Sequence, residues 1–170
     1  MISGKLISIL TFPGIIIHEW AHQKFCDWSH VNVHKVVYFH FGSPSGYVIH
    51  EEPKNYKQIF WISVGPLIIN SLATIFFSFL ASGARPETFI SYLLLWVAIS
   101  VGMHSFPSDH DMKNILEKSK DELKKGGTIL HYLSYPFVWL IFIANKLSFF
   151  WFDLIYAVIL VGFGGGLSGY

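Results

Sequence analysis

The residues with the clearest capacity for chemistry form the pattern H-E-x-x-H, which lies in an apolar stretch near the amino terminus. The stretch PGIIIHEWAHQKF, residues 13–25, carries His18, Glu19 and His22. On a helix, positions i and i+4 lie on one face, so both imidazoles can reach a single ion. Such polar groups in an apolar segment are costly unless they are bound or paired. We therefore expect a metal site, with interfacial histidines that hydrogen-bond a neighbouring helix as the alternative.

A zinc ion held by His18 and His22 would supply what peptide hydrolysis requires. Zinc lowers the pKa of its bound water to about 7 and polarises a carbonyl. Glu19, the next residue along the helix, can take the proton of that water and deliver it to the leaving amine. A catalytic zinc also needs a third protein ligand. The segment HSFPSDHDMKN offers four candidates, which are His104, Asp109, His110 and Asp111.

The composition is typical of a membrane protein and not of a soluble domain. Of the 170 residues, 52% are hydrophobic and 14% are charged, and the mean hydropathy is +0.46. The polar stretches are too short to bury a core of their own, so we expect a single integral membrane domain over residues 1–170. The net charge of +1 gives no basis for nucleic-acid binding. The single cysteine, Cys26, cannot form an internal disulfide.

Apolar stretches long enough to cross a bilayer recur along the chain. A helix rises about 1.5 Å per residue and the hydrocarbon layer is about 30 Å thick, so a span needs roughly 20 residues. We expect five spans, with four as the alternative, over residues 2–25, 59–81 and 89–106 and twice within 128–166, which is interrupted at Asn145 and Lys146. The predicted fold is therefore an all-α polytopic membrane protein of about five transmembrane helices.

Two of the polar connections are predicted to have structure of their own. Between the first two spans, β-prone runs at residues 36–41 and 47–50 flank GSPSG, which predicts a small β-hairpin. Between the third and fourth spans, apolar residues recur at helical spacing among lysines and acids. This pattern predicts an amphipathic helix on the membrane surface, with a solvated charged loop as the alternative. The apolar residues are Met112, Ile115, Leu116 and Leu123, and Gly126 and Gly127 stop the helix.

The lysines indicate an orientation. With five alternating spans, Lys5, Arg85 and Lys146 fall on one side of the membrane and nine lysines fall on the other. Positive residues favour the cytoplasm, so we expect the hairpin and the active site to face the cytoplasm of a prokaryotic cell, in a multi-pass protein of its plasma membrane. The nine lysines are Lys24, Lys35, Lys54, Lys57, Lys113, Lys118, Lys120, Lys124 and Lys125.

The order of three motifs resembles that of the site-2 protease family of intramembrane zinc metalloproteases. HEWAH near the end of one span is followed by the hairpin, by GPLIIN at the start of the next span, and by FPSDHDMKNIL at the end of a third. The family shows H-E-x-x-H, G-P-x-x-N and an N-x-x-P-x-x-x-L-D-G pattern whose aspartate binds zinc. The resemblance covers residues 10–117. It implies that His18 and His22 bind zinc, that Glu19 is the general base and that Asn70 holds the substrate or the active-site geometry.

The third motif departs from the family pattern. It lacks L-D-G, and two aspartates compete at a short spacing from Pro107. Alignment of DMKNIL with the family's D-G-G-R-I-L style favours Asp111 over Asp109 as the third zinc ligand. We expect Asp109 to be the N-cap of the following helix and His104 to hydrogen-bond a ligand.

The function that this resemblance implies is a zinc-dependent endopeptidase that hydrolyses peptide bonds in or near transmembrane segments of its substrates. One zinc per chain would be held in a metalloprotease core over about residues 2–117, and a C-terminal transmembrane hairpin would follow at 128–166. The expected partners are the lipid bilayer and a membrane protein or transmembrane peptide. The alternative is a non-catalytic membrane protein that binds zinc structurally or acts as a partner-binding scaffold. Substrate and oligomeric state are left open.

Overall fold

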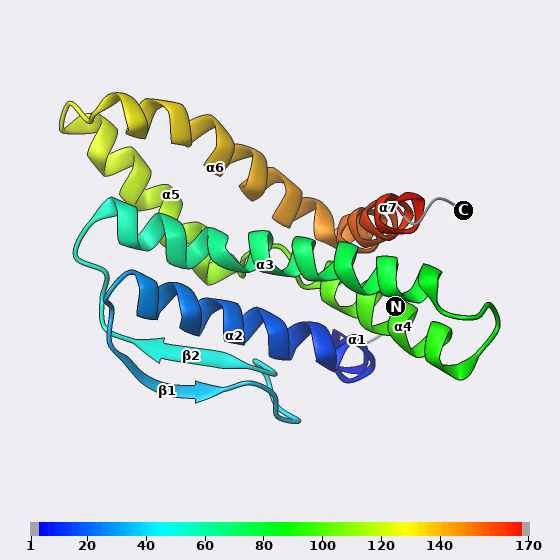
Figure 1. Ribbon diagram of the computed structural model, residues 1–170. Helices are drawn as coiled ribbons and strands as arrows, with labels where there is room; N and C mark the ends of the chain where they lie inside the picture. Colours follow the sequence, from blue (N-terminus) through cyan, green and yellow to red (C-terminus); the bar gives the residue numbers. More distant parts are fainter. Residues whose placement is uncertain (1–3, 168–170) are drawn as a thin grey trace.

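The computed structural model describes residues 4–167, which are mainly helical (Figure 1). This part of the chain forms seven α-helices, one 3-10 turn and a two-stranded antiparallel sheet. The predicted helical fold with one small hairpin is therefore confirmed. The helices are α1 (Gly4–Leu10), α2 (Phe12–Trp28), α3 (Tyr56–Gly83), α4 (Phe89–Met103), α5 (Asp109–Lys124), α6 (Ile129–Leu147) and α7 (Phe152–Gly166). The strands are β1 (Val33–Val37) and β2 (Tyr47–His50), and the 3-10 turn is Ser148–Phe150.

The long helix α3 is the central element of the fold. It packs against α2, α4, α5 and α7 (Figure 1). Near its start it also contacts α6, because the Tyr56 hydroxyl lies 2.6 Å from that of Ser134. Both strands of the hairpin lie against α2, and α6 packs on α5. The hairpin and the α5–α6 pair therefore lie on opposite sides of the layer that α2 and α3 form.

The first apolar stretch is not one helix, as the sequence predicted, because the chain breaks at Thr11 between α1 and α2. Pro13 lies in the first turn of α2. It has no backbone N–H, so it cannot donate the hydrogen bond that would continue the helix from α1 into α2. The Thr11 hydroxyl lies 2.7 Å from the Ile7 carbonyl and 2.8 Å from Nε2 of His104. The break therefore has a local cause, proline chemistry, and a distant one, the contact with the end of α4.

The hairpin has the predicted second strand, but the predicted first strand is wrong in position. Residues 36–41 were expected to be extended, whereas β1 covers Val33–Val37 and pairs Val37 with Tyr47. Beyond Val37 the chain leaves the sheet because the Tyr38 hydroxyl hydrogen-bonds Gln23 of α2, and the ring of Phe39 lies 5.7 Å from that of Phe12. The connection between the strands is therefore a long loop that follows α2.

The predicted amphipathic helix is confirmed as α5, and the alternative of a solvated loop is wrong. Its apolar residues Met112, Ile115 and Leu116 are buried in a cluster with Val138 and Ile141 of α6. The apolar face is thus covered by protein rather than turned to a membrane surface. The helix ends at Lys124, and Gly126 follows with a φ of 79°, a left-handed conformation that glycine adopts without strain.

The two C-terminal helices do not form the predicted antiparallel hairpin. The chain changes direction by 110° between α6 and α7, and α7 packs on α3 and α4 while α6 packs on α5. Lys146, at the end of α6, lies 2.8 Å from Asp109 at the start of α5. The prediction that Lys146 lies across the membrane from the segment containing Asp109 is therefore wrong, because α6 returns to the level of that segment.

By length and composition alone, one helix of the described chain could cross a membrane, and this is α3 with 28 residues. The pair α6 and α7 meets the same criterion only when both are taken together across their bend. The helix α4 has 15 residues and ends before the predicted limit of residue 106, because the chain turns at His104. The expected number of spans stays a prediction.

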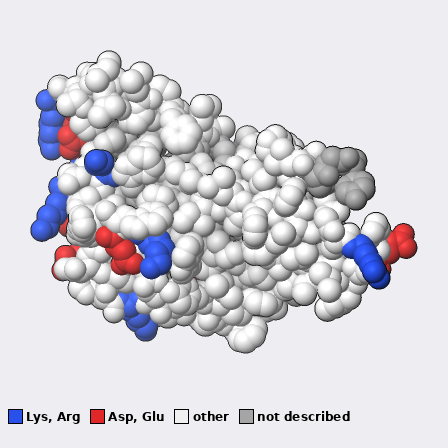
Figure 2. Space-filling model, in the orientation of Figure 1, with Lys and Arg blue, Asp and Glu red and all other residues white. Residues whose placement is uncertain are grey.

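Charged side chains are unevenly distributed over the surface. On the face shown in Figure 2 they gather at the two ends of the long axis of the molecule, and a broad band between them carries none. Large apolar side chains are exposed on the helices of the bundle. Leu72 and Phe76 on α3 and Ile159 and Phe163 on α7 are each more than half exposed. The surface of the bundle is therefore unusually apolar for a water-soluble protein.

Packing at the junction of α3, α4 and α7 predicts opposite effects for two glycine substitutions. A Cβ at Gly102 would lie 2.7 Å from Cβ of Ala157 and 2.9 Å from its Cα, whereas a Cβ at Gly162 meets nothing within 4 Å. Alanine gains about 1 kcal/mol of helix propensity over glycine, and overpacking costs about 1–3 kcal/mol. We expect Gly102→Ala to lower the melting temperature in detergent and the control Gly162→Ala to keep or raise it. Equal melting temperatures would contradict this packing.

Candidate metal centre

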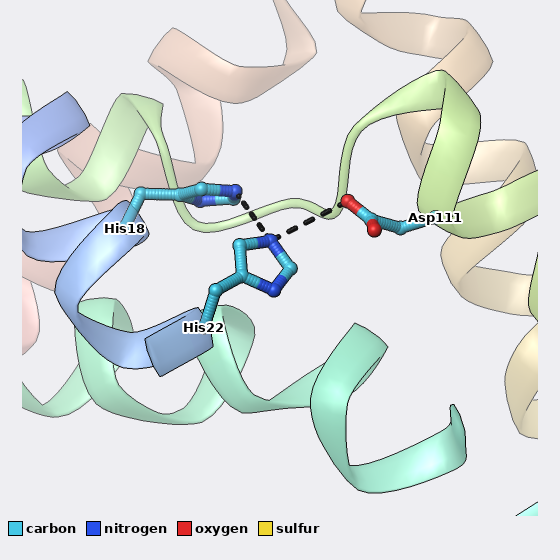
Figure 3. Close-up of side chains that lie close together, drawn as sticks. All are labelled: His18, His22 and Asp111. Carbon is cyan, nitrogen blue, oxygen red and sulfur yellow. Dashed lines mark hydrogen bonds and ion pairs between the residues drawn. The ribbon is translucent and has the colours of Figure 1, made fainter. Parts of the chain in front are cut away.

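Three side chains with metal-binding atoms lie together although they come from two distant parts of the chain. His18 and His22 project from α2 and Asp111 from the first turn of α5 (Figure 3). Nε2 of His18 lies 3.1 Å from Nε2 of His22, which lies 3.4 Å from Oδ2 of Asp111. All three donor atoms lie within 4.8 Å of one another, and both histidines are buried. The group thus offers two nitrogen donors and one oxygen donor to a single point.

Two of the three separations between these atoms are compatible with a zinc ion, and the third is at most 4.8 Å. Ligands at about 2.0–2.1 Å from a tetrahedral zinc are separated from each other by roughly 3.3–3.4 Å. The two short separations, 3.1 and 3.4 Å, are close to that value. Two histidines and a carboxylate are also a donor set of catalytic zinc sites, which keep the fourth position for water or substrate. The arrangement can therefore hold a metal with an open position, and other divalent transition metals use the same donors.

The ring of His18 is oriented by the backbone at the end of α4. Its Nδ1 lies 2.7 Å from the carbonyl oxygen of His104, and because a carbonyl only accepts, Nδ1 carries the proton and Nε2 keeps its lone pair for a metal. His104 was predicted to hydrogen-bond a ligand. It does so through its main chain, while its half-buried ring contacts Thr11 instead.

The ring of His22 is oriented by α3. It hydrogen-bonds the backbone of Ile62, four residues before Pro66. In a regular helix the N–H of residue 66 would bond the carbonyl of residue 62, but proline has no N–H. Pro66, inside α3, therefore leaves the Ile62 carbonyl available to a partner outside the helix. Pro66 of the GPLIIN motif thus has a physical role, because it leaves a carbonyl free beside His22.

Asp111 is held by the start of its own helix. Ser108 is the N-cap of α5, and its backbone N–H and hydroxyl both contact Oδ2 of Asp111, at 3.2 and 2.5 Å. Burial alone would raise the pKa of Asp111, but the neighbouring His22 and the hydrogen bond with Ser108 outweigh burial and hold this pKa well below its usual value. The carboxylate is therefore ionised and available as a ligand.

Asp109 does not have the predicted role of N-cap. It is the first residue within α5, because Ser108 takes the cap position with an extended backbone and accepts from the Asp111 N–H. The Asp109 carboxylate points instead to Lys146, 2.8 Å away, and His110 contacts Asn114 on the surface. Of the four candidates for the third ligand, the structure thus brings only Asp111 into the group.

Asn70 lies behind the metal-binding group and is completely buried. Its side-chain amide donates to the carbonyl of His104 at 2.8 Å, and the Val101 carbonyl lies 3.4 Å away. Asn70 therefore binds the same carbonyl oxygen that orients His18. This geometry connects α3 to the end of α4 and gives Asn70 a place in holding the site together.

Glu19 is buried and faces the same cavity as the ligands. A cavity of about 420 Å³ is lined by His18, Glu19, His22 and Asp111 and, on its other side, by β2. A Cβ at Gly46 would lie 2.7 Å from Cγ of Glu19, so the loop before β2 approaches the glutamate closely only because position 46 is glycine. The residues of β2 that line the cavity are Tyr47, Val48 and His50.

Sequence reasoning missed several of these positions. It did not predict that Tyr47, Val48 and His50 line the cavity, because only the packing of β2 beside α2 decides which residues of the hairpin meet it. The missing N–H of Pro66 is a signal in the sequence that could have indicated a free carbonyl at Ile62. No local pattern could have indicated the His104 carbonyl.

The comparisons with known proteins give no relative, since no family model, curated protein or solved structure matches the chain. The resemblance to site-2 proteases therefore stays a prediction that rests on the order of the three motifs.

The two aspartates predict a clear contrast in metal binding. We expect the purified protein to carry about one zinc per chain and Asp111→Asn to lose or strongly weaken it, because one of three protein ligands is changed. His18→Ala and His22→Ala should do the same. Asp109→Asn is the matched control and should keep zinc within a few-fold of the wild-type affinity. Elemental analysis measures the zinc content and chelator competition the zinc affinity of each variant. An unchanged zinc content in Asp111→Asn would mean that Asp111 is not a ligand.

The free carbonyl at Ile62 predicts that Pro66 tunes the metal site. Pro66→Ala restores an N–H that competes with His22 for this carbonyl, so we expect zinc affinity to fall by about tenfold, a typical effect of losing an outer hydrogen bond to a ligand. Pro136, inside α6, is the matched control, because Pro136→Ala removes a helix proline without a ligand nearby. Equal zinc affinity in both variants, measured by chelator competition, would contradict the role of Pro66.

Proposed function

We propose that this protein is a zinc-dependent intramembrane endopeptidase that hydrolyses peptide bonds in or near transmembrane segments of other proteins. One observation carries the proposal. The metal-binding group His18, His22 and Asp111 and the carboxylate of Glu19 line a single cavity. A structural zinc site is usually closed by four protein ligands, whereas this group has three and faces open space.

The surface supports the membrane part of the proposal. An uncharged band separates two charged ends on the face in Figure 2, and large apolar side chains are exposed along α3 and α7. The helices α3 and α7 are also joined by hydrogen bonds, from the Ser78 hydroxyl to the Val161 carbonyl at 2.6 Å and between Ser71 and Tyr156 at 2.7 Å. Such bonds between small polar residues are common between helices in lipid.

The orientation in the membrane is also part of the proposal. The loops that follow α2, precede α3 and join α5 to α6 lie at one end of the molecule (Figure 1). Five lysines lie in these loops or within about one turn of them, which are Lys24, Lys54, Lys57, Lys124 and Lys125. The opposite end has the α3–α4 loop, which contains Arg85 and Glu87. By the positive-inside bias we infer that the lysine-rich end faces the cytoplasm, in a multi-pass protein of a prokaryotic plasma membrane.

Different residues would bind the metal, transfer protons and contact the substrate during hydrolysis. His18, His22 and Asp111 would hold zinc, which when bound supplies a Lewis acid that activates water and polarises the scissile carbonyl. Glu19 accepts the proton of the attacking water and returns it to the leaving amine. A transmembrane substrate arrives as a helix whose amides are already paired, so it must be unwound to reach the ligands. The β2 residues that line the cavity form the wall along which the unwound segment would pass.

The alternative function is a membrane protein that binds zinc without catalysis. Glu19 is a buried carboxylate beside the ligands, but it does not belong to the metal-binding group. A protein that only binds zinc has no need of such a carboxylate. The two functions therefore differ at this residue.

Substitution of Glu19 tests the proposal. A positioned general base contributes about 10²–10⁴-fold to a rate, so we expect Glu19→Gln to lower cleavage by at least about 100-fold while zinc content stays at the wild-type level. The assay reconstitutes the protein in vesicles with a set of transmembrane peptides and detects new termini by mass spectrometry. Glu117→Gln, on the exposed side of α5, is the matched control and should cleave normally.

Two outcomes would overturn the peptidase. Cleavage by Glu19→Gln at the wild-type rate would remove Glu19 from the reaction. A wild-type protein that binds one zinc tightly and cleaves none of the peptides would favour the non-catalytic alternative.

A further inference from the structure

The end of α6 contacts the segment that leads into α5, far from it in the sequence. The side-chain amide of Asn145 donates to the carbonyl of Pro107 at 2.7 Å. The next residue, Lys146, donates to Oδ1 of Asp109 at 2.8 Å. Two consecutive side chains in the last turn of α6 thus bind two positions on either side of Ser108, the N-cap of α5.

This segment needs external support because the metal-binding group is assembled from two elements. His18 and His22 are four residues apart on one helix, so helix geometry alone sets their separation. Asp111 comes from α5, and its bond with Ser108 orients the carboxylate relative to α5 only. The separation between Asp111 and His22 therefore depends on how the start of α5 is placed against α2.

The C-terminal helices supply several of the contacts that place the start of α5, beside those that α3 makes with α5. Residues 104–108 between α4 and α5 form no helix or strand. Pro107 is completely buried, and the ring of Phe106 lies 4.9 Å from that of Tyr156 on α7. Further along, the buried face of α5 packs on Val138 and Ile141 of α6. The same two helices, α6 and α7, therefore hold the segment on both sides of Asp111.

The two tethers differ in expected strength. The Lys146 and Asp109 side chains are 52% and 67% exposed, and exposed ion pairs contribute little. Asn145 is partly buried and donates to the carbonyl of the buried residue Pro107. Loss of this hydrogen bond would leave the carbonyl as an unpaired acceptor. The Asn145 bond is therefore the main tether and the ion pair is a minor one.

We propose that Asn145 is a positioning residue for the metal centre. The last turn of α6 thus supports the site although it contributes no metal ligand. By binding the Pro107 carbonyl, Asn145 keeps the start of α5 where Asp111 reaches the same ion as His22, and Lys146 adds a weaker tether. This role rests on the proposed zinc site at His18, His22 and Asp111. It assigns a purpose to the C-terminal helices, which lie outside the resemblance to a known family.

The test measures zinc affinity of the full-length protein in detergent by competition with a chromophoric chelator. Asn145→Ala and the similarly sized Asn145→Leu both remove the donor, and we expect each to weaken zinc binding by about tenfold or more. Lys146→Met should weaken it by a few-fold at most, and Lys146→Arg should restore wild-type affinity. Asn114→Ala, which removes a surface asparagine from α5, is the matched control and should leave zinc affinity unchanged.

A double-mutant cycle separates positioning from a general loss of structure. In an Asp111→Asn background the ligand is already absent, so adding Asn145→Leu should weaken residual zinc binding much less than it does in the wild type. Equal effects in both backgrounds would mean that Asn145 acts on the fold as a whole, which would overturn the proposal. Melting temperatures of the zinc-free variants should stay close to that of the wild type.

The failure of this inference and the failure of the zinc site give different results. Wild-type protein that binds zinc together with Asn145 variants of equal affinity would overturn the positioning role alone. Wild-type protein that binds no zinc would contradict both the zinc site and the positioning role of Asn145.

Discussion

The carbonyl oxygen of His104 is the point on which the rest of the structure depends. It lies at the C-terminal end of α4, where helix carbonyls have no partner within the helix. Two buried side chains from other helices donate to it, His18 of α2 at 2.7 Å and Asn70 of α3 at 2.8 Å. A helix end that would otherwise carry an unsatisfied acceptor thus joins three helices at one oxygen atom, directly behind the metal-binding group.

The cost of leaving buried polar groups unpaired also explains other contacts of the bundle. In apolar surroundings an unpaired donor or acceptor costs several kcal/mol, and several polar side chains on the helices bind neighbouring helices. Ser78 and Ser71 of α3 each bind α7, and the carbonyl freed by Pro66 binds His22. Side-chain hydrogen bonds between helices therefore serve both to join the bundle and to orient the metal ligands.

The third ligand obeys a different constraint from the two histidines. His18 and His22 are set by one helix, whereas Asp111 belongs to a helix whose apolar face packs on both α3 and α6. The hairpin supplies the opposite wall of the cavity, and its loop comes close to Glu19 at Gly46. The centre is thus lined by residues from the N-terminal and middle thirds of the chain, and helices of the C-terminal third support the start of α5 from outside the cavity.

The sequence by itself determined the features that depend on near neighbours. The i, i+4 spacing puts His18 and His22 on one face, the apolar period predicts α5, and the turn residues predict a hairpin with β2 at Tyr47–His50. Only the tertiary structure decided between Asp109 and Asp111, because it brings Asp111 to His22 of α2 and Asp109 to Lys146 of α6. It also decided the break at Thr11, the start of β1 and the return of Lys146 to the level of Asp109. These features arise from contacts between residues far apart in the chain, and local periodicity carries no information about which distant surfaces will pack together.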